Sequence, residues 1–167
     1  MRISWSKFLI LVVMSLLGLT ASGMVFYMYD TLHQQLPVCT ATQPIFGVRV
    51  DCNAVLSSSY NSIYGINLDL LAGAYFVVSL ALVCFVVFGS EWLYAKAFTT
   101  LFAWRFLGLI IVPYLMFVEF GILRTICVYC TVMHVAILVD FGIITYFIFY
   151  KKDIRTFLLP TGQEQLS

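Results

Sequence analysis

Four long apolar segments constrain the fold of this 167-residue chain more than any other feature of its sequence. At about 1.5 Å per helical residue, each segment is long enough to cross a hydrocarbon layer about 30 Å thick. Charged residues make up only 10% of the chain, whereas soluble domains average about 25%. The sequence therefore predicts an all-α membrane protein, in which four helices form a single transmembrane bundle over residues 1–167. We expect the spans at residues 8–28, 68–88, 97–118 and 130–150.

The first apolar segment has a second interpretation, because a secretory signal peptide shows a similar pattern. Arg2 and Lys7 precede the segment, and the small residues at 21–23 resemble a cleavage site. The apolar run nevertheless continues through Phe26, beyond the point where a signal peptidase would cut. We therefore expect this segment to remain as a membrane helix.

The distribution of Lys and Arg predicts how the bundle is oriented, since cytoplasmic loops of membrane proteins carry an excess of these residues. One side of the predicted bundle carries Arg2, Lys7, Lys96, Lys151, Lys152 and Arg155, and the other carries Arg49 and Arg124. We therefore expect both termini in the cytoplasm, and residues 29–67 and 119–129 outside a plasma or inner membrane. The net charge of +1 provides no basic surface, so we expect no nucleic-acid partner.

Four of the five cysteines fall in the two predicted outer loops. The fifth, Cys84, lies within the second span, and we interpret it as a small apolar residue. Disulfides persist outside the cytosol and are rare within it, so the cysteines and the basic residues predict the same orientation. The outer cysteines are Cys39, Cys52, Cys127 and Cys130.

Cys127 and Cys130 form a C-x-x-C pair at the start of the fourth predicted span. A disulfide between them would close too short a loop to stabilise the fold much. At a helix N-terminus the helix dipole favours a thiolate, the reactive form in thiol–disulfide exchange. We therefore favour a redox pair over two structural disulfides. Zinc binding by Cys127, Cys130 and His134, with Cys52 as fourth ligand, is a weaker alternative, because structural zinc usually organises a polar domain.

The outer loop at residues 29–67 is polar and contains one short helical pattern. Asp51 is placed to cap an amphipathic helix that runs from Cys52 to about Leu56. Cys39 precedes this helix, in a part of the loop that we expect to be exposed. The first outer loop therefore carries two cysteines in different local settings.

The stretch CNAVLSSSY at residues 52–60, followed by Tyr64-Gly65, resembles the C-x-x-V-L-S-S-x-Y…F-G signature of the vitamin K epoxide reductase family. The C-x-x-C that opens the fourth span resembles that family's second motif. The resemblance covers about residues 8–150 and is to the prokaryotic, disulfide-forming branch; DsbB-type oxidases carry their C-x-x-C in the first outer loop instead. Many prokaryotic members have a fused thioredoxin-like domain, whereas this sequence ends at Ser167. We therefore expect a separate thioredoxin-like or DsbA-like partner.

The resemblance implies a relay of electrons. A reduced partner would attack a Cys39–Cys52 disulfide at Cys39, and Cys52 would pass the electrons to Cys127. Cys130 would reduce a membrane quinone of the ubiquinone, menaquinone or phylloquinone type, and so sustain disulfide bond formation. The alternatives are a vitamin K epoxide or quinone reductase on the same scaffold, and a non-enzymatic membrane subunit stapled by disulfides.

Four polar residues are candidates for the quinone site. His134 lies four residues after Cys130 on the same helix face, where the family often has a tyrosine. Asn61 begins the sequence N-S-I-Y-G, which resembles the family motif N-S-I-F-G, whose asparagine binds the quinone. Ser57 and Ser58 would help to place the loop helix against the C-x-x-C, or would serve as turn residues.

Two charged residues, Arg105 and Asp140, lie deep within the third and fourth predicted spans. Counted from the cytoplasmic ends of their helices, their depths differ by about 3 Å. A charge inside a membrane is costly unless it is paired. We therefore predict that these two side chains form an ion pair with a structural role.

Overall fold

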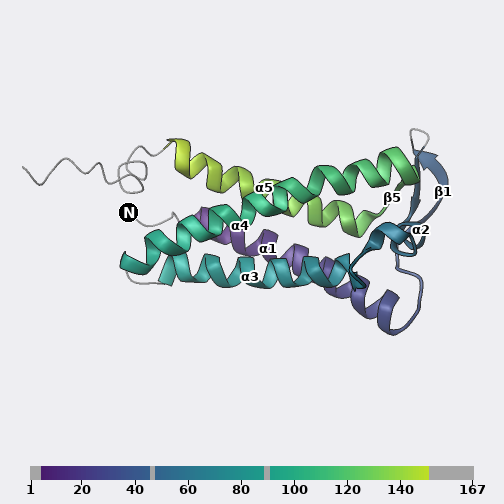
Figure 1. Ribbon diagram of the computed structural model, residues 1–167, viewed down its shortest axis with the longest axis horizontal. Coiled ribbons are helices and arrows are strands. Elements are labelled where there is room, and N and C mark those ends of the chain that lie inside the picture. Colours follow the sequence, from purple (N-terminus) through teal and green to yellow (C-terminus); the bar gives the residue numbers. More distant parts are fainter. Residues whose placement is uncertain (1–4, 46–47, 89–90, 151–167) are drawn as a thin grey trace, which may run out of the picture.

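The computed structural model describes residues 5–45, 48–88 and 91–150, and helices dominate it (Figure 1). Within these residues, four helical stretches are long and apolar enough to cross a membrane. Two of them continue past their α-helical part through a π-helical turn. The elements are α1 (Trp5–Val25) with η1 (Phe26–Thr31), α3 (Leu68–Phe88), α4 (Glu91–Phe117) with η3 (Val118–Leu123), and α5 (Val128–Tyr150). The predicted all-α bundle of four membrane helices is therefore confirmed.

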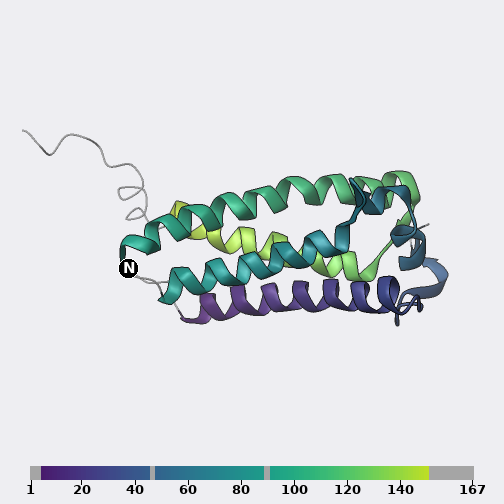
Figure 2. The same ribbon diagram turned by 60° about the horizontal axis from the view of Figure 1, so that its bottom comes forward.

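The four long helices lie side by side (Figures 1 and 2). α1 packs against α3 and α5, and α4 packs against the same two helices. The start of α1 and the end of α5 lie at one end of the bundle, on the left of Figure 1. The cysteine-bearing loops gather at the opposite end, where they form a cap over the helices.

The third membrane helix ends later than the sequence predicts. η3 extends it through Leu123, whereas the predicted outer loop begins at residue 119. The segment V-E-F-G-I-L permits this extension, because its one charged residue, Glu119, is buried and does not face water. Arg124 ends the helix in a left-handed conformation with a φ of 50°, and its backbone N–H donates to the backbone carbonyl of Glu119.

A small sheet, which the sequence analysis did not predict, joins the two outer loops. Its strand order is β1-β2-β5, with β1 and β2 antiparallel and β2 and β5 parallel, so that Val50 pairs with Ile126. Because β2 and β5 end at the same edge of the sheet, the residues that follow them, Cys52 and Cys127, are brought together. The cap elements are β1 (Thr40–Ile45), β2 (Val48–Asp51), α2 (Cys52–Leu56), η2 (Ser59–Asn61), β3 (Ser62–Ile63), β4 (Ile66–Asn67) and β5 (Thr125–Ile126).

A buried ion pair lies in the centre of the bundle. Arg105 of α4 and Asp140 of α5 form a salt bridge, and both side chains are fully buried. The hydroxyl of Ser15, on α1, donates to Asp140 at 3.4 Å and accepts from Arg105 at 3.1 Å. The predicted pair is therefore confirmed, and the serine connects a third helix to it. Farther from the cap, the helices pack through a buried apolar cluster that includes Phe8, Leu11, Val83, Phe98, Leu101 and Ile144.

Candidate active site

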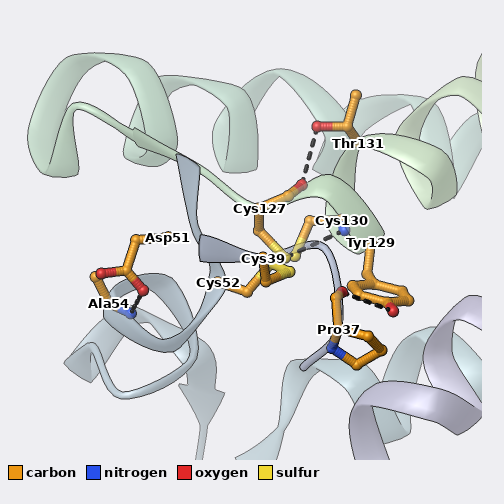
Figure 3. The surroundings of a disulfide bond; sticks show 9 residues. All are labelled: Pro37, Cys39, Asp51, Cys52, Ala54, Cys127, Tyr129, Cys130 and Thr131. Carbon is orange, nitrogen blue, oxygen red and sulfur yellow. Dashed lines mark hydrogen bonds between the residues drawn. A yellow bond between two sulfur atoms is a disulfide. The ribbon is translucent and has the colours of Figure 1, made fainter. Parts of the chain in front are cut away.

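Two pairs of cysteines meet where the cap rests on the bundle (Figure 3). Cys39 and Cys52 are joined by a disulfide, with their Cα atoms 5.3 Å apart, and Cys127 and Cys130 are free thiols. Cys39, Cys52 and Cys127 belong to one buried apolar cluster, in which they are 2%, 0% and 0% exposed. The disulfide that the family resemblance implies is therefore present, and it lies in the same cluster as the Cys127 thiol.

Cys52 is positioned by the strand before it and the helix after it. It is the first residue of α2, and the side chain of Asp51 caps this helix by accepting the backbone N–H of Ala54 at 3.1 Å. The predicted cap and the predicted helix from Cys52 to Leu56 are both confirmed. A helix that begins at this cysteine fixes the direction of its side chain toward the bundle.

Cys127 caps the N-terminus of α5 (Figure 3). Its Sγ accepts the backbone N–H of Cys130 at 3.3 Å, and its carbonyl accepts both the backbone N–H and the hydroxyl of Thr131 at 2.9 Å. The N–H groups and the dipole at a helix N-terminus stabilise negative charge. The Cys127 sulfur is therefore held at the helix N-terminus, in the same buried cluster as the disulfide with which it could exchange.

The prediction that Cys39 is exposed is wrong, because its side chain is only 2% exposed although it lies in a loop. The loop folds onto the start of α5, where Leu36 is buried and the hydroxyl of Tyr129 donates to the carbonyl of Pro37 at 3.2 Å. Val38 is 82% exposed and has a φ of 64°, a left-handed conformation that is strained for a β-branched residue. An attacking thiolate therefore reaches the Cys39 sulfur only if this short segment moves.

A cavity of about 390 Å³ extends from the C-x-x-C pair into the bundle. Its wall consists mostly of apolar side chains from α3, α4 and α5, and its volume lies within the range of about 300–1,000 Å³ that is usual for small-molecule sites. Cys130 lines this cavity, whereas Cys127 is not part of the wall. The two thiols therefore differ in their surroundings: Cys127 adjoins the disulfide, and Cys130 opens into the cavity.

The four residues proposed for the quinone site occupy different places. His134, Asn61 and Ser58 line the cavity, and Ser57 does not. The hydroxyl of Ser58 donates to the backbone carbonyl of Val55 at 2.7 Å, so this serine also closes the end of α2. His134 and Asn61 are therefore the two predicted residues that bring side-chain nitrogen atoms to the cavity wall.

Two buried carboxylic acids that were not predicted to be site residues also line the cavity. Glu119, on η3, is 4% exposed, and its carboxyl group interacts with the backbone N–H of Cys127 and the thiol of Cys130. Asp69, in the first turn of α3, is 3% exposed, and Ser22 donates its hydroxyl to the Asp69 backbone carbonyl at 2.5 Å. Both acids stand at predicted span boundaries, where a carboxylate normally faces water. The apolar residues on either side of Glu119 are the signal that would have pointed to its burial.

The outer cysteines are divided between a disulfide and two free thiols in the part of the chain that the structure describes. No group of three or more His, Cys, Asp or Glu side chains that would hold a metal ion is found among those residues. A disulfide beside two free thiols offers thiol–disulfide exchange as its chemistry.

A membrane helical bundle with a buried disulfide next to two free thiols, one of which opens into an intramembrane cavity, has the features of a membrane oxidoreductase. The chain belongs to the vitamin K epoxide reductase family, whose model matches residues 9–145. The match reaches all four membrane helices and includes both cysteine pairs. A comparison with curated protein sequences finds no match. The family and the fold together identify an integral membrane oxidoreductase.

Proposed function

We propose that this chain is a quinone-dependent thiol oxidoreductase that sustains disulfide formation outside the cytoplasm. It accepts electrons from a separate thioredoxin-like or DsbA-like dithiol protein and passes them to a membrane quinone. The observation that carries the proposal is the order of the groups: the Cys39–Cys52 disulfide adjoins Cys127, and Cys130, three residues further on, lines an apolar cavity within the bundle.

The first half of the reaction is a series of thiol–disulfide exchanges. A thiolate of the partner attacks Cys39, breaks its bond to Cys52, and forms a mixed disulfide. The second partner thiol resolves that bond, which leaves Cys39 and Cys52 as thiols. The Cys52 thiolate then attacks Cys127 in a Cys127–Cys130 disulfide, and Cys39 closes the loop disulfide again by attacking Cys52. The result is an oxidised loop pair and a reduced C-x-x-C pair, the same combination that the structure contains.

The second half takes place at the cavity, whose residues fit a quinone. A quinone ring and isoprenoid tail are apolar, as is most of the cavity wall, and the two ring carbonyls require hydrogen-bond donors. His134 and Asn61 can each supply a donor from the wall. When bound, the quinone supplies the acceptor for two electrons and two protons. The chain holds it beside Cys130 and keeps bulk water away from the thiol.

The orientation of the bundle is part of the proposal. The distribution of basic residues supports a cytoplasmic start of α1 and end of α5, and with it a cap whose cysteines face outward. This side is the one where disulfides persist and where a partner that forms disulfides works. Alkylating the outer cysteines of intact cells with a membrane-impermeant reagent, after mild reduction, would fail if the cap faced the cytoplasm.

The test uses the purified chain in lipid nanodiscs with a reduced thioredoxin-like protein and a short-chain quinone. Quinol formation is followed by absorbance, and the redox state of each cysteine by alkylation and mass spectrometry. We expect steady quinol formation, which Cys130→Ser abolishes and which Cys84→Ser, as a matched thiol control, leaves unchanged. A partner that lacks its second thiol should accumulate a mixed disulfide with Cys39, because its one thiolate opens the Cys39–Cys52 bond and no thiol resolves the product. The proposal fails if Cys127 and Cys130 never respond to quinone, and turnover of a vitamin K epoxide with no oxidation of the partner would favour the reductase alternative.

A further inference from the structure

We propose that Glu119 is the acid–base residue of Cys130: it removes the thiol proton when the C-x-x-C pair is oxidised and returns a proton when the pair is reduced. This inference rests on the proposed function, because it assigns a step within the same relay. It concerns a residue that neither the cysteine motifs nor the family resemblance pointed to.

The position of Glu119 carries the inference. It lies in the π-helical turn η3, is 4% exposed, and lines the same cavity as Cys130. Its carboxyl group interacts with the Cys130 thiol and with the backbone N–H of Cys127. The interaction with the backbone N–H of Cys127 orients the carboxyl group. The interaction with the thiol of Cys130 places it within reach of the thiol proton. π-Helical turns inside α-helices occur often at functional sites, and this one brings an acid to the reacting sulfur.

Burial explains why Cys130 needs such a group. Oxidation of a dithiol releases two electrons and two protons, and a thiolate without a counter-charge is costly in a cavity with an apolar wall. The Cys127 sulfur accepts a backbone N–H at the start of α5. Cys130 lies past that position. Of the two buried carboxylic acids of the cavity, Glu119 interacts directly with the Cys130 thiol, and Asp69 acts on it at longer range. Different groups therefore contact the two sulfurs: a backbone N–H contacts the Cys127 sulfur, and the Glu119 carboxyl group contacts the Cys130 thiol.

The proton movements balance in both halves of the reaction. During reduction of the pair, Cys52 attacks Cys127, the Cys127–Cys130 bond breaks, and Cys130 leaves as a thiolate that takes the proton of the Glu119 carboxylic acid. During oxidation, the Glu119 carboxylate takes the Cys130 proton, the Cys127–Cys130 bond forms, and two electrons pass to the quinone. One proton reaches the quinone from Glu119 and the second comes from the outer solution. The two protons that the partner thiols release to that solution balance this second proton and the one that restores the Glu119 carboxylic acid.

Other titratable groups face the same cavity and must be separated from Glu119 by experiment. From α3 these are Asp69 and Tyr75, from α5 His134, from α4 Tyr114, and from η2 Tyr60. Cys127 faces Glu119 from the start of α5 through its backbone N–H. A variant that changes only Glu119 leaves all of these groups in place, so a change in proton-dependent behaviour is assigned to the glutamate.

The decisive experiment needs no quinone. Protein with both disulfides formed is mixed with excess reduced thioredoxin-like partner, quenched by alkylation at successive times, and analysed for each cysteine by mass spectrometry. All variants carry Cys84→Ser, so that only the outer cysteines report. We expect Glu119→Gln to slow the reduction of Cys127 and Cys130 about a hundredfold, a usual contribution of general acid–base catalysis, while the loop disulfide opens at the wild-type rate. Glu119→Asp, which keeps the carboxyl group, should recover at least a tenth of the wild-type rate.

A second measurement follows a single turnover of the reduced protein with a short-chain quinone over a range of pH. The wild-type rate should fall at acid pH as the Glu119 carboxylate becomes protonated, and Glu119→Gln should lose this acid limb together with about a hundredfold in rate. The inference is overturned if Glu119→Gln stays within threefold of wild type in both measurements, or if Glu119→Asp is as slow as Glu119→Gln. A wild-type protein whose C-x-x-C accepts electrons but never reduces quinone would instead overturn the proposed function, and the quinone-free measurement would still decide the role of Glu119.

Discussion

The buried pair of Arg105 and Asp140 makes a sharp prediction about stability. Removing one partner, as in Asp140→Leu, leaves a guanidinium group in the centre of the bundle beside the neutral side chains of Ser15 and Tyr75, without its carboxylate. Removing both, as in Arg105→Leu with Asp140→Leu, leaves apolar side chains in an apolar setting and no uncompensated charge. We therefore expect the double variant to be more stable than either single variant.

The magnitude follows from the complete burial of both side chains. Breaking a buried ion pair from one side costs about 3–5 kcal/mol, whereas replacing the whole pair by apolar residues is often close to neutral. For a chain of this length, about 1 kcal/mol corresponds to a shift of about 2–4 °C in melting temperature. Each single variant should therefore melt about 6–20 °C below the wild type, and the double variant should regain at least half of that loss. Ser15→Ala, which removes two hydrogen bonds but no charge, should cost only about 1–2 kcal/mol.

The assay is thermal unfolding in one detergent at one protein concentration, followed by circular dichroism for all four variants. Quinone reduction measured on the same samples separates stability from function, because the pair lies away from the cysteines and should affect rates only through the amount of folded protein. The reasoning is refuted if the double variant is no more stable than the less stable of the two single variants.

Three further predictions concern the site. Tyr129→Phe removes the hydrogen bond to the carbonyl of Pro37, which is worth about 1 kcal/mol. The partner should therefore open the loop disulfide about fivefold faster in the quinone-free assay. An unchanged rate would show that this hydrogen bond does not hold the Cys39 segment closed. Val38→Asn places a residue that tolerates the left-handed conformation at a φ of 64°. It should raise the free energy of unfolding by about 1 kcal/mol, measured as a melting temperature about 2–4 °C above that of the wild type. A melting temperature below that of the wild type would contradict backbone strain at Val38. His134→Phe removes a polar group from the cavity wall and should raise the KM for quinone up to about tenfold. It should not slow the quinone-free disulfide exchange. Slower exchange would indicate that His134 has a structural role instead.

Local patterns in the sequence were enough to predict the bundle but not the contacts of its cap. The spans, the Arg105–Asp140 pair and the capped helix at Cys52 follow from local hydropathy, charge depth and capping chemistry. The strand β5 has only two residues, and its pairing with β2 joins residues 76 positions apart, such as Arg49 and Thr125, so no local pattern predicts it. Because the pairing of β2 and β5 could not be predicted, only the family resemblance indicated from the sequence that Cys52 and Cys127 come together.

The burial of Glu119 and of Cys39 escaped prediction for a related physical reason. Both residues stand where a membrane segment meets a polar loop, and at such a boundary an acid or a loop cysteine is normally assumed to face water. The cap changes this, because it covers the outer end of the bundle and extends the low-dielectric interior beyond the predicted membrane boundary. A π-helical turn that ends at Leu123 then turns Glu119 toward the cavity, and the packing of Leu36 does the same for the segment before Cys39.

In the proposed relay, the different surroundings of the two C-x-x-C sulfurs would give them different tasks. The Cys127 sulfur accepts a backbone N–H at the start of α5 and adjoins the loop disulfide, so it is placed to exchange bonds with Cys52. The Cys130 sulfur has a carboxylic acid beside it and an apolar cavity before it, so its reactions couple the movement of electrons to that of a proton. Disulfide exchange needs the first kind of sulfur, and quinone reduction, which consumes protons, needs the second. We therefore expect that changing the groups around the Cys127 and Cys130 sulfurs, while keeping the cysteines, stops electron flow. Both cysteine pairs should still be able to form disulfides.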